Sequence, residues 1–157
     1  MKIRSIFQGM GVCIFLILIL VVSIFLYNSE NLGKRRVLYF EAVDGSGLYI
    51  ESRRITEYST TQGRDVHVQQ FVQELLLGPV TNGFKSLFLQ GTRLESCFVQ
   101  ENILFINLSK EALFPGATTS ATKDGVNLLV YNIKKNFSWI ESVEIYIDGN
   151  KVYENIV

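Results

Sequence analysis

The chain has 157 residues, with 15 basic and 15 acidic side chains and a single histidine, so it is formally neutral at pH 7. Without Lys2 and Arg4, 13 basic side chains (15 minus 2) face 15 acidic ones, and no basic stripe with interleaved aromatic residues follows. This balance excludes a nucleic-acid-binding surface. Only Cys97 lies beyond the apolar N-terminus, which excludes an intradomain disulfide; its predicted strand position favours a buried thiol over pairing between chains.

Residues 9–27, GMGVCIFLILILVVSIFLY, form an apolar segment without a charged side chain. A helix of this length would span about 28 Å, close to the hydrocarbon thickness of a bilayer. We therefore predict a short cytoplasmic N-terminus over residues 1–8 and one transmembrane anchor over residues 9–27. A cleaved signal peptide is the alternative, because Lys2 and Arg4 form a basic n-region, but no A-x-A cleavage site follows. Cys13 lies at the start of the apolar run rather than after it, which argues against a lipid-modified N-terminal cysteine.

Residues 28–36, NSENLGKRR, are polar and predict a linker to a domain over residues 37–157. The basic residues 34–36 balance those of the N-terminus, so the positive-inside count is close to a tie. A first helix with a very short basic N-terminus normally inserts with that end in the cytoplasm, and we expect the domain on the other side. Residues 34–36 are expected to be solvated, with contact to anionic lipid headgroups as the alternative.

The domain begins with a predicted hairpin, in which strands over residues 36–40 and 48–55 flank a glycine-rich turn. A first helix follows, with Asp65 as its expected N-cap. Its buried face is formed by apolar residues at helical spacing, Val68, Phe71, Val72, Leu75 and Leu76. Gly78 suits a left-handed cap and Pro79 has no amide for a further turn, so the helix ends there. Residues 87–94 are then expected to return as sheet.

Residues 94–99 and 103–108 predict a second hairpin whose strands are apolar on both faces, as is typical of interior strands. A second helix is predicted over about residues 123–136, and its buried stripe is Val126, Leu129, Val130, Ile133 and Phe137. Aliphatic residues alternate with Glu144 and Tyr146 over residues 143–147. Asp148-Gly149 follows as a two-residue hairpin signal, and the chain returns through residues 151–153. These elements predict an α+β fold of two layers, with both helices on one face of a mostly antiparallel sheet, preceded by one transmembrane helix.

The sequence contains no pattern that indicates catalysis or metal binding. His67 has no second histidine or cysteine near it, whereas zinc sites need three or four clustered donors. No G-x-S-x-G motif accompanies a serine, and no spacing among the scattered carboxylates selects a catalytic pair. Gly45-Ser46-Gly47 lacks the lysine and the helix opening of a phosphate-binding loop. We predict no catalytic residues, no metal and no cofactor.

Binding surfaces remain as candidates for function. The candidate contacts for a protein partner are exposed positions on the two predicted helices, Gln69, Gln73, Glu74, Lys134 and Lys135. Three tyrosines of the predicted strands, Tyr49, Tyr146 and Tyr153, are candidates for a shared solvent-facing sheet surface.

The order of several short motifs is informative where each alone is weak. A helix closing on residues 75–79, LLLGP, precedes a strand entry at residues 91–94, GTRL. Residues 106–111, INLSKE, then precede the second helix, and residues 143–149, VEIYIDG, follow it. In this order and spacing, the motifs over about residues 37–155 resemble the GerMN domain family, which takes its name from the bacterial sporulation and spore-germination protein GerM.

The resemblance implies a small module without catalytic residues, similar to ring-building domains of bacterial secretion and sporulation complexes that associate through helix and sheet surfaces. Leu89 departs from a usual proline of the family, and Asn132 departs from a frequent threonine. The sporulation protein has two copies of the domain and this chain has one, so a sporulation role does not follow.

From the sequence we expect a non-enzymatic protein of the bacterial cytoplasmic membrane whose extracytoplasmic, periplasmic domain binds protein partners or copies of itself. The alternative is a groove on the open sheet face that holds a cell-wall fragment or another small molecule. An envelope hydrolase ranks third, because it would need clustered carboxylates.

Overall fold

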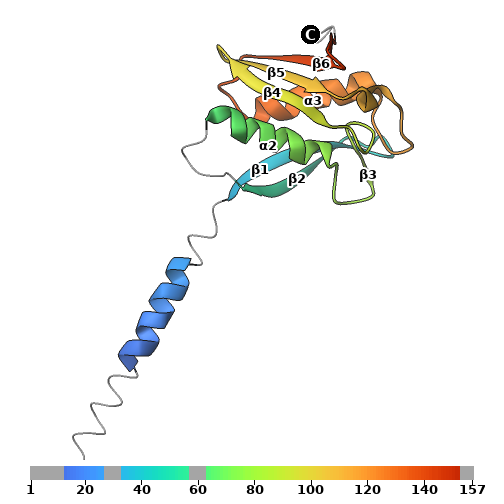
Figure 1. Cartoon of the computed structure of the whole chain (residues 1–157). Coiled ribbons are helices and arrows are strands. Elements are labelled where there is room, and N and C mark those ends of the chain that lie inside the picture. Colours follow the sequence, from blue (N-terminus) through green and yellow to red (C-terminus); the bar gives the residue numbers. More distant parts are fainter. Residues whose placement is uncertain (1–12, 27–32, 57–62, 153–157) are drawn as a thin grey trace, which may run out of the picture. The chain divides into compact units, whose positions relative to one another are not determined.

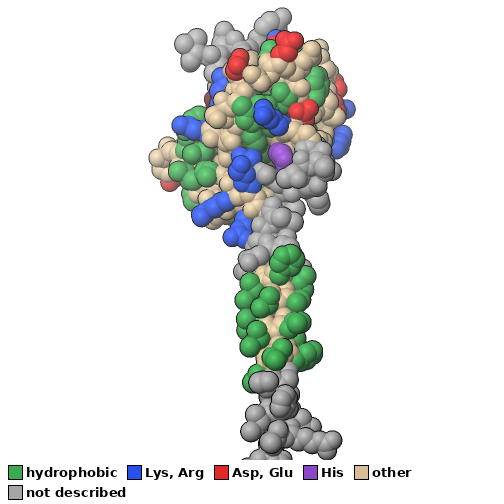
Figure 2. All heavy atoms as spheres, turned by 90° about the vertical axis from the view of Figure 1, so that its left-hand side faces the viewer, with side chains coloured by type: hydrophobic (Ala, Val, Ile, Leu, Met, Phe, Trp, Pro, Cys, Tyr) green, Lys and Arg blue, Asp and Glu red, His purple; other side chains and the backbone are tan. Residues whose placement is uncertain are grey.

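The computed structural model describes residues 13–26, 33–56 and 63–152 (Figure 1). The chain divides into two compact units, Met1–Gly33 and Lys34–Val157. In the first unit, residues 13–26 form a helix whose large apolar side chains are exposed, as Figure 2 shows for one face. Among the described residues, no helix combines the length and the apolar character needed to cross a membrane. Four residues at the start of the predicted span over 9–27 and one at its end lie outside the described residues.

The second unit opens with a small sheet in the order β2-β1-β3, formed by β1 (Gly33–Ala42), β2 (Leu48–Thr56) and β3 (Phe84–Lys85). The predicted hairpin is confirmed, although β1 begins at Gly33, so that the strand includes the last part of the predicted linker. Alternate residues of β1, Leu38, Phe40 and Ala42, are buried, as expected for a strand with one face on the core.

A second sheet of four strands has the order β4-β5-β6-β7. Its strands are β4 (Leu94–Gln100), β5 (Ile103–Leu108), β6 (Ser142–Ile147) and β7 (Asn150–Lys151). The β4–β5 and β6–β7 pairs are antiparallel, as the hairpin motifs predicted, while β5 and β6 run parallel. The crossover between them carries a 3-10 turn, η1 (Lys110–Leu113), and α3 (Thr122–Asn136). The prediction that both β4 and β5 are interior strands is wrong for β4, which lies at the edge with Phe98 46% exposed.

The two helices supply the centre of one hydrophobic core that both sheets share. Both predicted helical faces are confirmed: α2 (Arg64–Leu76) buries four of its five predicted residues, with Leu76 partly buried, and α3 together with Phe137 buries all five. The α+β class is confirmed, but the expected single sheet is replaced by two. Figure 1 shows α2 and α3 between the four-stranded sheet and the β1–β2 hairpin, and α2 contacts both β4 and β2.

Two asparagines of α3 bond to the stretch of β1 that β3 does not reach. The Tyr39 amide donates to Asn132 Oδ1 (2.8 Å), and Asn132 Nδ2 donates back to the Tyr39 carbonyl (2.9 Å). Asn136 repeats the exchange with Val37, at 3.2 Å and 2.7 Å. Four residues advance a helix by about 6 Å, close to the 6.6–6.8 Å of two strand residues, so the two spacings match. Along this stretch α3 takes the place of a neighbouring strand.

The end of α2 lies where the sequence placed it. Gly78 has a φ of +81°, the left-handed conformation that favours glycine. Arg53 of β2 donates to the carbonyl oxygens of Glu74 (3.1 Å) and Gly78 (2.6 Å), and so satisfies acceptors that the helix leaves open.

Two local predictions around α2 are wrong. The N-cap is Gly63 rather than Asp65, which lies inside the first turn, and no side chain caps this end. Residues 87–93 do not return as a strand: the sheet pairing after α2 is made by β3, and Leu87 and Phe88 are buried in the core instead.

Candidate functional site: a groove along α3

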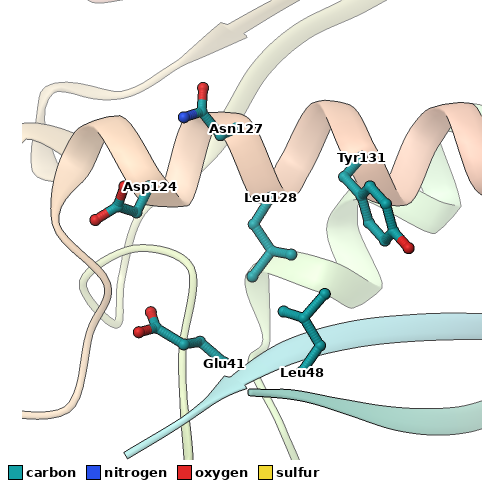
Figure 3. Close-up of a pocket in the computed structure, with 6 residues that line it drawn as sticks. All are labelled: Glu41, Leu48, Asp124, Asn127, Leu128 and Tyr131. Atoms are coloured by element: carbon teal, nitrogen blue, oxygen red, sulfur yellow. The ribbon is translucent and has the colours of Figure 1, made fainter. Parts of the chain in front are cut away.

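An open groove with a cavity volume of about 510 Å³ lies between α3 and the β1–β2 hairpin (Figure 3). Its lining residues are Glu41, Leu48, Asp124, Asn127, Leu128 and Tyr131. Leu48 and Leu128 point toward each other across the groove, while the carboxylates of Glu41 and Asp124 lie at one end. A second hollow of about 430 Å³ shares Asn127 and Tyr131 and adds Val130, Lys134 and Lys135. We call this continuous surface the α3 groove.

Helical spacing brings the α3 residues of the groove together. Positions 124, 127, 128 and 131 fall on one face of a helix, next to the stripe that enters the core. Tyr131 packs edge-to-face on Tyr39 of β1, with ring centroids 5.1 Å apart, and remains 38% exposed. Leu48, at the start of β2, is 52% exposed. The middle of the groove is therefore apolar and open to solvent.

The two ends of the α3 groove carry opposite charge. At the acidic end, Glu41 accepts hydrogen bonds from Lys85 Nζ (2.9 Å) and Ser120 Oγ (3.2 Å), and the bond from Lys85 lowers the pKa of this carboxyl. At the other end, Lys134 and Lys135 are exposed in the last turn of α3, where the helix dipole stabilises positive charge. The α3 groove therefore has an apolar middle between polar ends.

Nothing in the groove indicates catalysis. No group of three or more metal-ligating side chains occurs within the described residues. His67 is half-buried near the start of α2 and does not line the groove. The arrangement can bind and orient a partner.

A smaller hollow of about 280 Å³, separate from the α3 groove, lies on the open face of the four-stranded sheet. Phe98 of β4 and Phe105 of β5 stack there with ring centroids 5.0 Å apart, and Tyr146 of β6 lines the same hollow. The Tyr146 hydroxyl donates to Glu144 Oε2 (3.0 Å). The other carboxylate oxygen, Glu144 Oε1, forms a salt bridge with Lys151 Nζ (3.0 Å).

The residues that the sequence singled out are distributed over several surfaces. Lys134 and Lys135 lie in the α3 groove. On α2, Gln73 is exposed and Gln69 half-buried, while Glu74 faces Arg53 with 3.5 Å between Oε2 and Nη1.

The shared tyrosine surface is not formed. Tyr49 belongs to the small sheet, where it stacks on Phe84 with ring centroids 3.8 Å apart, whereas Tyr146 belongs to the other sheet. Tyr153 lies outside the described residues. Leu48, Tyr131 and Phe98 were not predicted as surface residues, because periodicity alone does not reveal which apolar side chains stay uncovered.

Cys97 on β4 gives a direct test of the packing between this strand and α2. The thiol is partly buried, and burial, with the Asp65 carboxylate as a second cause, raises its pKa from 9.0 to about 12. At pH 8 the thiolate fraction is then about a thousandfold below that of an ordinary thiol, so alkylation by iodoacetamide is expected to be slower by a similar factor.

The measurement is the alkylation rate of the folded chain with Cys13→Ser. In the control, Cys97→Ala is combined with Ser96→Cys, which places a thiol at the exposed neighbouring position of the same strand. Equal rates for the two thiols would contradict the burial of Cys97.

The chain is similar to known proteins in both sequence and fold. Residues 37–153 match the family described as Germane: Sporulation and spore germination. An "Uncharacterized lipoprotein" of Treponema pallidum (strain Nichols) is 29% identical over 109 residues, which cover 69% of this chain and 79% of the relative.

Two solved structures are similar to the domain. The first GerMN domain of the sporulation protein GerM from Bacillus subtilis has a TM-score of 0.57 at 18% identity, covering 79% of this chain and 90% of that chain. The tandem GerMN domains of the same protein give 0.56 at 16% identity, covering 75% of this chain and 40% of that chain. At this identity the two structures support the fold alone, while the family match covers more than half of the chain. The chain therefore belongs to the GerMN domain family.

Proposed function

We propose that this protein is a non-enzymatic, membrane-anchored component of the bacterial cell envelope whose GerMN domain binds another protein through the α3 groove. The observation that carries the proposal is the groove itself, an exposed apolar middle between an acidic and a basic end. The partner is a second protein or another copy of this chain.

Anchoring by the N-terminal segment is the first part of the proposal. The uncharged apolar run over residues 9–27 supports a membrane-inserted segment, with the domain on the extracytoplasmic side. The similarity to a protein described as a lipoprotein also supports a place at a membrane. Confinement to a membrane raises the effective concentration of both partners, so an interface of modest area is sufficient.

Protein binding by the groove is the second part. Leu48 and Tyr131 keep 52% and 38% of their surface exposed, next to Leu128, which is nearly buried. Apolar surface of this kind, rimmed by polar residues, is typical of protein interaction sites. Tyrosine is one of the residues that most often dominates binding energy, which makes Tyr131 the expected centre of the contact.

The test is site-specific photocrosslinking of the full chain in membranes of its source cell. A photoreactive residue replacing Tyr131 is expected to give a discrete crosslinked species. Leu48→Arg places a charge in the apolar middle of the groove and is expected to reduce the yield at least tenfold, about 1.4 kcal/mol of binding.

Leu113→Arg is the matched control, because Leu113 is 53% exposed and does not line the groove. Its crosslinking yield is expected to stay within twofold of the parent. Absence of any Tyr131 crosslink, or an equal loss with both arginine variants, would contradict protein binding by the groove.

Ligand binding on the open sheet face is the second candidate function, favoured by the stacked rings of Phe98 and Phe105 beside Tyr146. In that case soluble cell-wall fragments are expected to raise the melting temperature of the full chain in detergent. Phe98→Ala is expected to abolish the shift and Leu113→Ala to preserve it. No shift at millimolar fragment would count against this candidate.

A further inference from the structure

Exposed basic side chains gather at the end of the domain where β1 begins. Lys34 and Arg35 open β1, Arg64 opens α2, and Lys134 and Lys135 close α3, and all five are exposed. We call these five residues the basic end. Figure 2 views this end of the domain and shows the Lys and Arg side chains mainly over its lower and middle parts.

Direct contacts hold the three elements of the basic end together. Arg36 Nη1 donates to the Asn136 carbonyl (3.0 Å), which joins the start of β1 to the end of α3. The Arg36 guanidinium lies 4.4 Å from the centre of the Phe137 ring, and Arg64 lies 5.6 Å from that of Trp139. The five cations are therefore displayed by packed elements rather than by independent loops.

Acidic side chains at the same end belong mainly to the other layer. Glu101 and Glu141 lie at the entrances of β5 and β6, where Asn102 Nδ2 donates to Glu141 Oε1 (3.2 Å). Asp65 is half-buried in the first turn of α2. Over the part of the chain that the structure describes, the exposed surface of the β1, α2 and α3 termini is thus predominantly positive.

The covalent chain limits how far this surface can move from the apolar segment. Six residue steps separate residue 27 from Gly33, and a fully extended chain covers at most about 22 Å over six steps. Where residues 9–27 are inserted in a bilayer, the first strand of the domain must start within that distance of the membrane. Lys34 and Arg35, which follow Gly33 in β1, then fall within a few Debye lengths of the lipid headgroups.

We propose that the basic end docks on the anionic phospholipid headgroups of the membrane that holds the N-terminal segment. The inference rests on the proposed anchoring. Each basic residue near an anionic surface adds to the attraction, and the tether keeps the local concentration of lipid high. Docking places Lys134 and Lys135 toward the membrane and directs the acidic end of the α3 groove, with Glu41 and Asp124, away from it.

The experiment uses the full chain with Cys13→Ser, reconstituted into phosphatidylcholine vesicles with and without 30% phosphatidylglycerol as the probe. A donor fluorophore is attached at Ser138→Cys, an exposed position beside Phe137, and the acceptor is on a lipid headgroup. A second donor position, Ala117→Cys, precedes the start of α3 and so reports on the opposite end of this helix, whose 15 residues span about 22 Å.

Energy transfer from position 138 is expected to rise with phosphatidylglycerol and to fall back in 0.5 M salt, because salt screens the attraction. Transfer from position 117 is expected to stay low in every vesicle. Lys34→Gln with Arg35→Gln is expected to lower the ratio of docked to undocked domain about fivefold per charge removed. Lys110→Gln with Lys123→Gln removes two exposed charges near the opposite end and is expected to leave the ratio unchanged.

Three results would overturn the inference. Equal transfer with and without phosphatidylglycerol, or equal effects of the two double variants, would refute docking while leaving the anchoring intact. Failure of the full chain to incorporate into either vesicle would refute the anchoring and the docking with it. Slow alkylation of Cys97 in each variant verifies that the domain is folded when the transfer is measured.

Discussion

Asn132→Ala is expected to lower the free energy of unfolding by about 3 kcal/mol or more, because it leaves buried backbone groups without hydrogen-bond partners. The side chain of Asn132 is fully buried and bonds to both polar groups of Tyr39 and to the Leu128 carbonyl (2.8 Å). Its removal leaves the Tyr39 amide and carbonyl without their partners and opens a cavity in α3's packing. The measurement is urea unfolding of the full chain in detergent, with near-ultraviolet circular dichroism as the signal.

Asn127→Ala provides the matched control on the same helix, since Asn127 lines the groove and is only half-buried. That change is expected to stay within about 0.5 kcal/mol of the parent. Asn132→Leu separates the two causes, because it keeps the volume and removes the hydrogen bonds. A loss for Asn132→Ala no greater than for Asn127→Ala would show that the amide does not support the strand.

Gly125→Ala is expected to destabilise the domain by about 3 kcal/mol, although alanine has a helix propensity about 1 kcal/mol better than glycine. A Cβ on Gly125 would run into the Leu87 carbonyl oxygen, and it would lie 3.1 Å from the Phe88 ring. Because the obstacle is backbone, α3 has to move away from residues 87–88, which are themselves buried in the core. The same unfolding measurement checks this result.

Gly83→Ala serves as the control, because a Cβ at Gly83 meets no atom within 4 Å. It is expected to change the free energy of unfolding by less than about 0.5 kcal/mol. Should Gly125→Ala instead be as stable as the parent or more so, helix propensity would outweigh the close approach of the two segments.

Local periodicity predicted the elements of this fold well. The stripes of α2 and α3 and the glycine that ends α2 depend on neighbours three to seven residues away, and each lies where the pattern placed it. The division into two sheets depended on partners about a hundred residues apart. Residues 37 and 39 of β1 bond to Asn136 and Asn132 where β3 does not reach, and no sequence pattern predicts such a pairing.

The candidate site was less predictable than the elements. Lys134 and Lys135 follow from the polar face of α3, and they do line the groove. Leu48 was assigned to a strand without a burial prediction, because alternation in β2 does not say which face is covered. Asn132 was noted only as a departure from a frequent threonine of the family, and its two-way bonding to Tyr39 required the packed structure.

The asparagine pairing of β1 bears on how the protein avoids self-templated aggregation. A strand with bare amides and carbonyls invites the strand of a neighbouring molecule, and natural proteins block such edges. Here two carboxamides occupy the hydrogen-bonding groups of residues 37 and 39, so a strand of a neighbouring molecule cannot pair with this stretch of β1. Chemical damage to either amide would therefore endanger solubility as well as folding, and ageing preparations are best watched for fibrils.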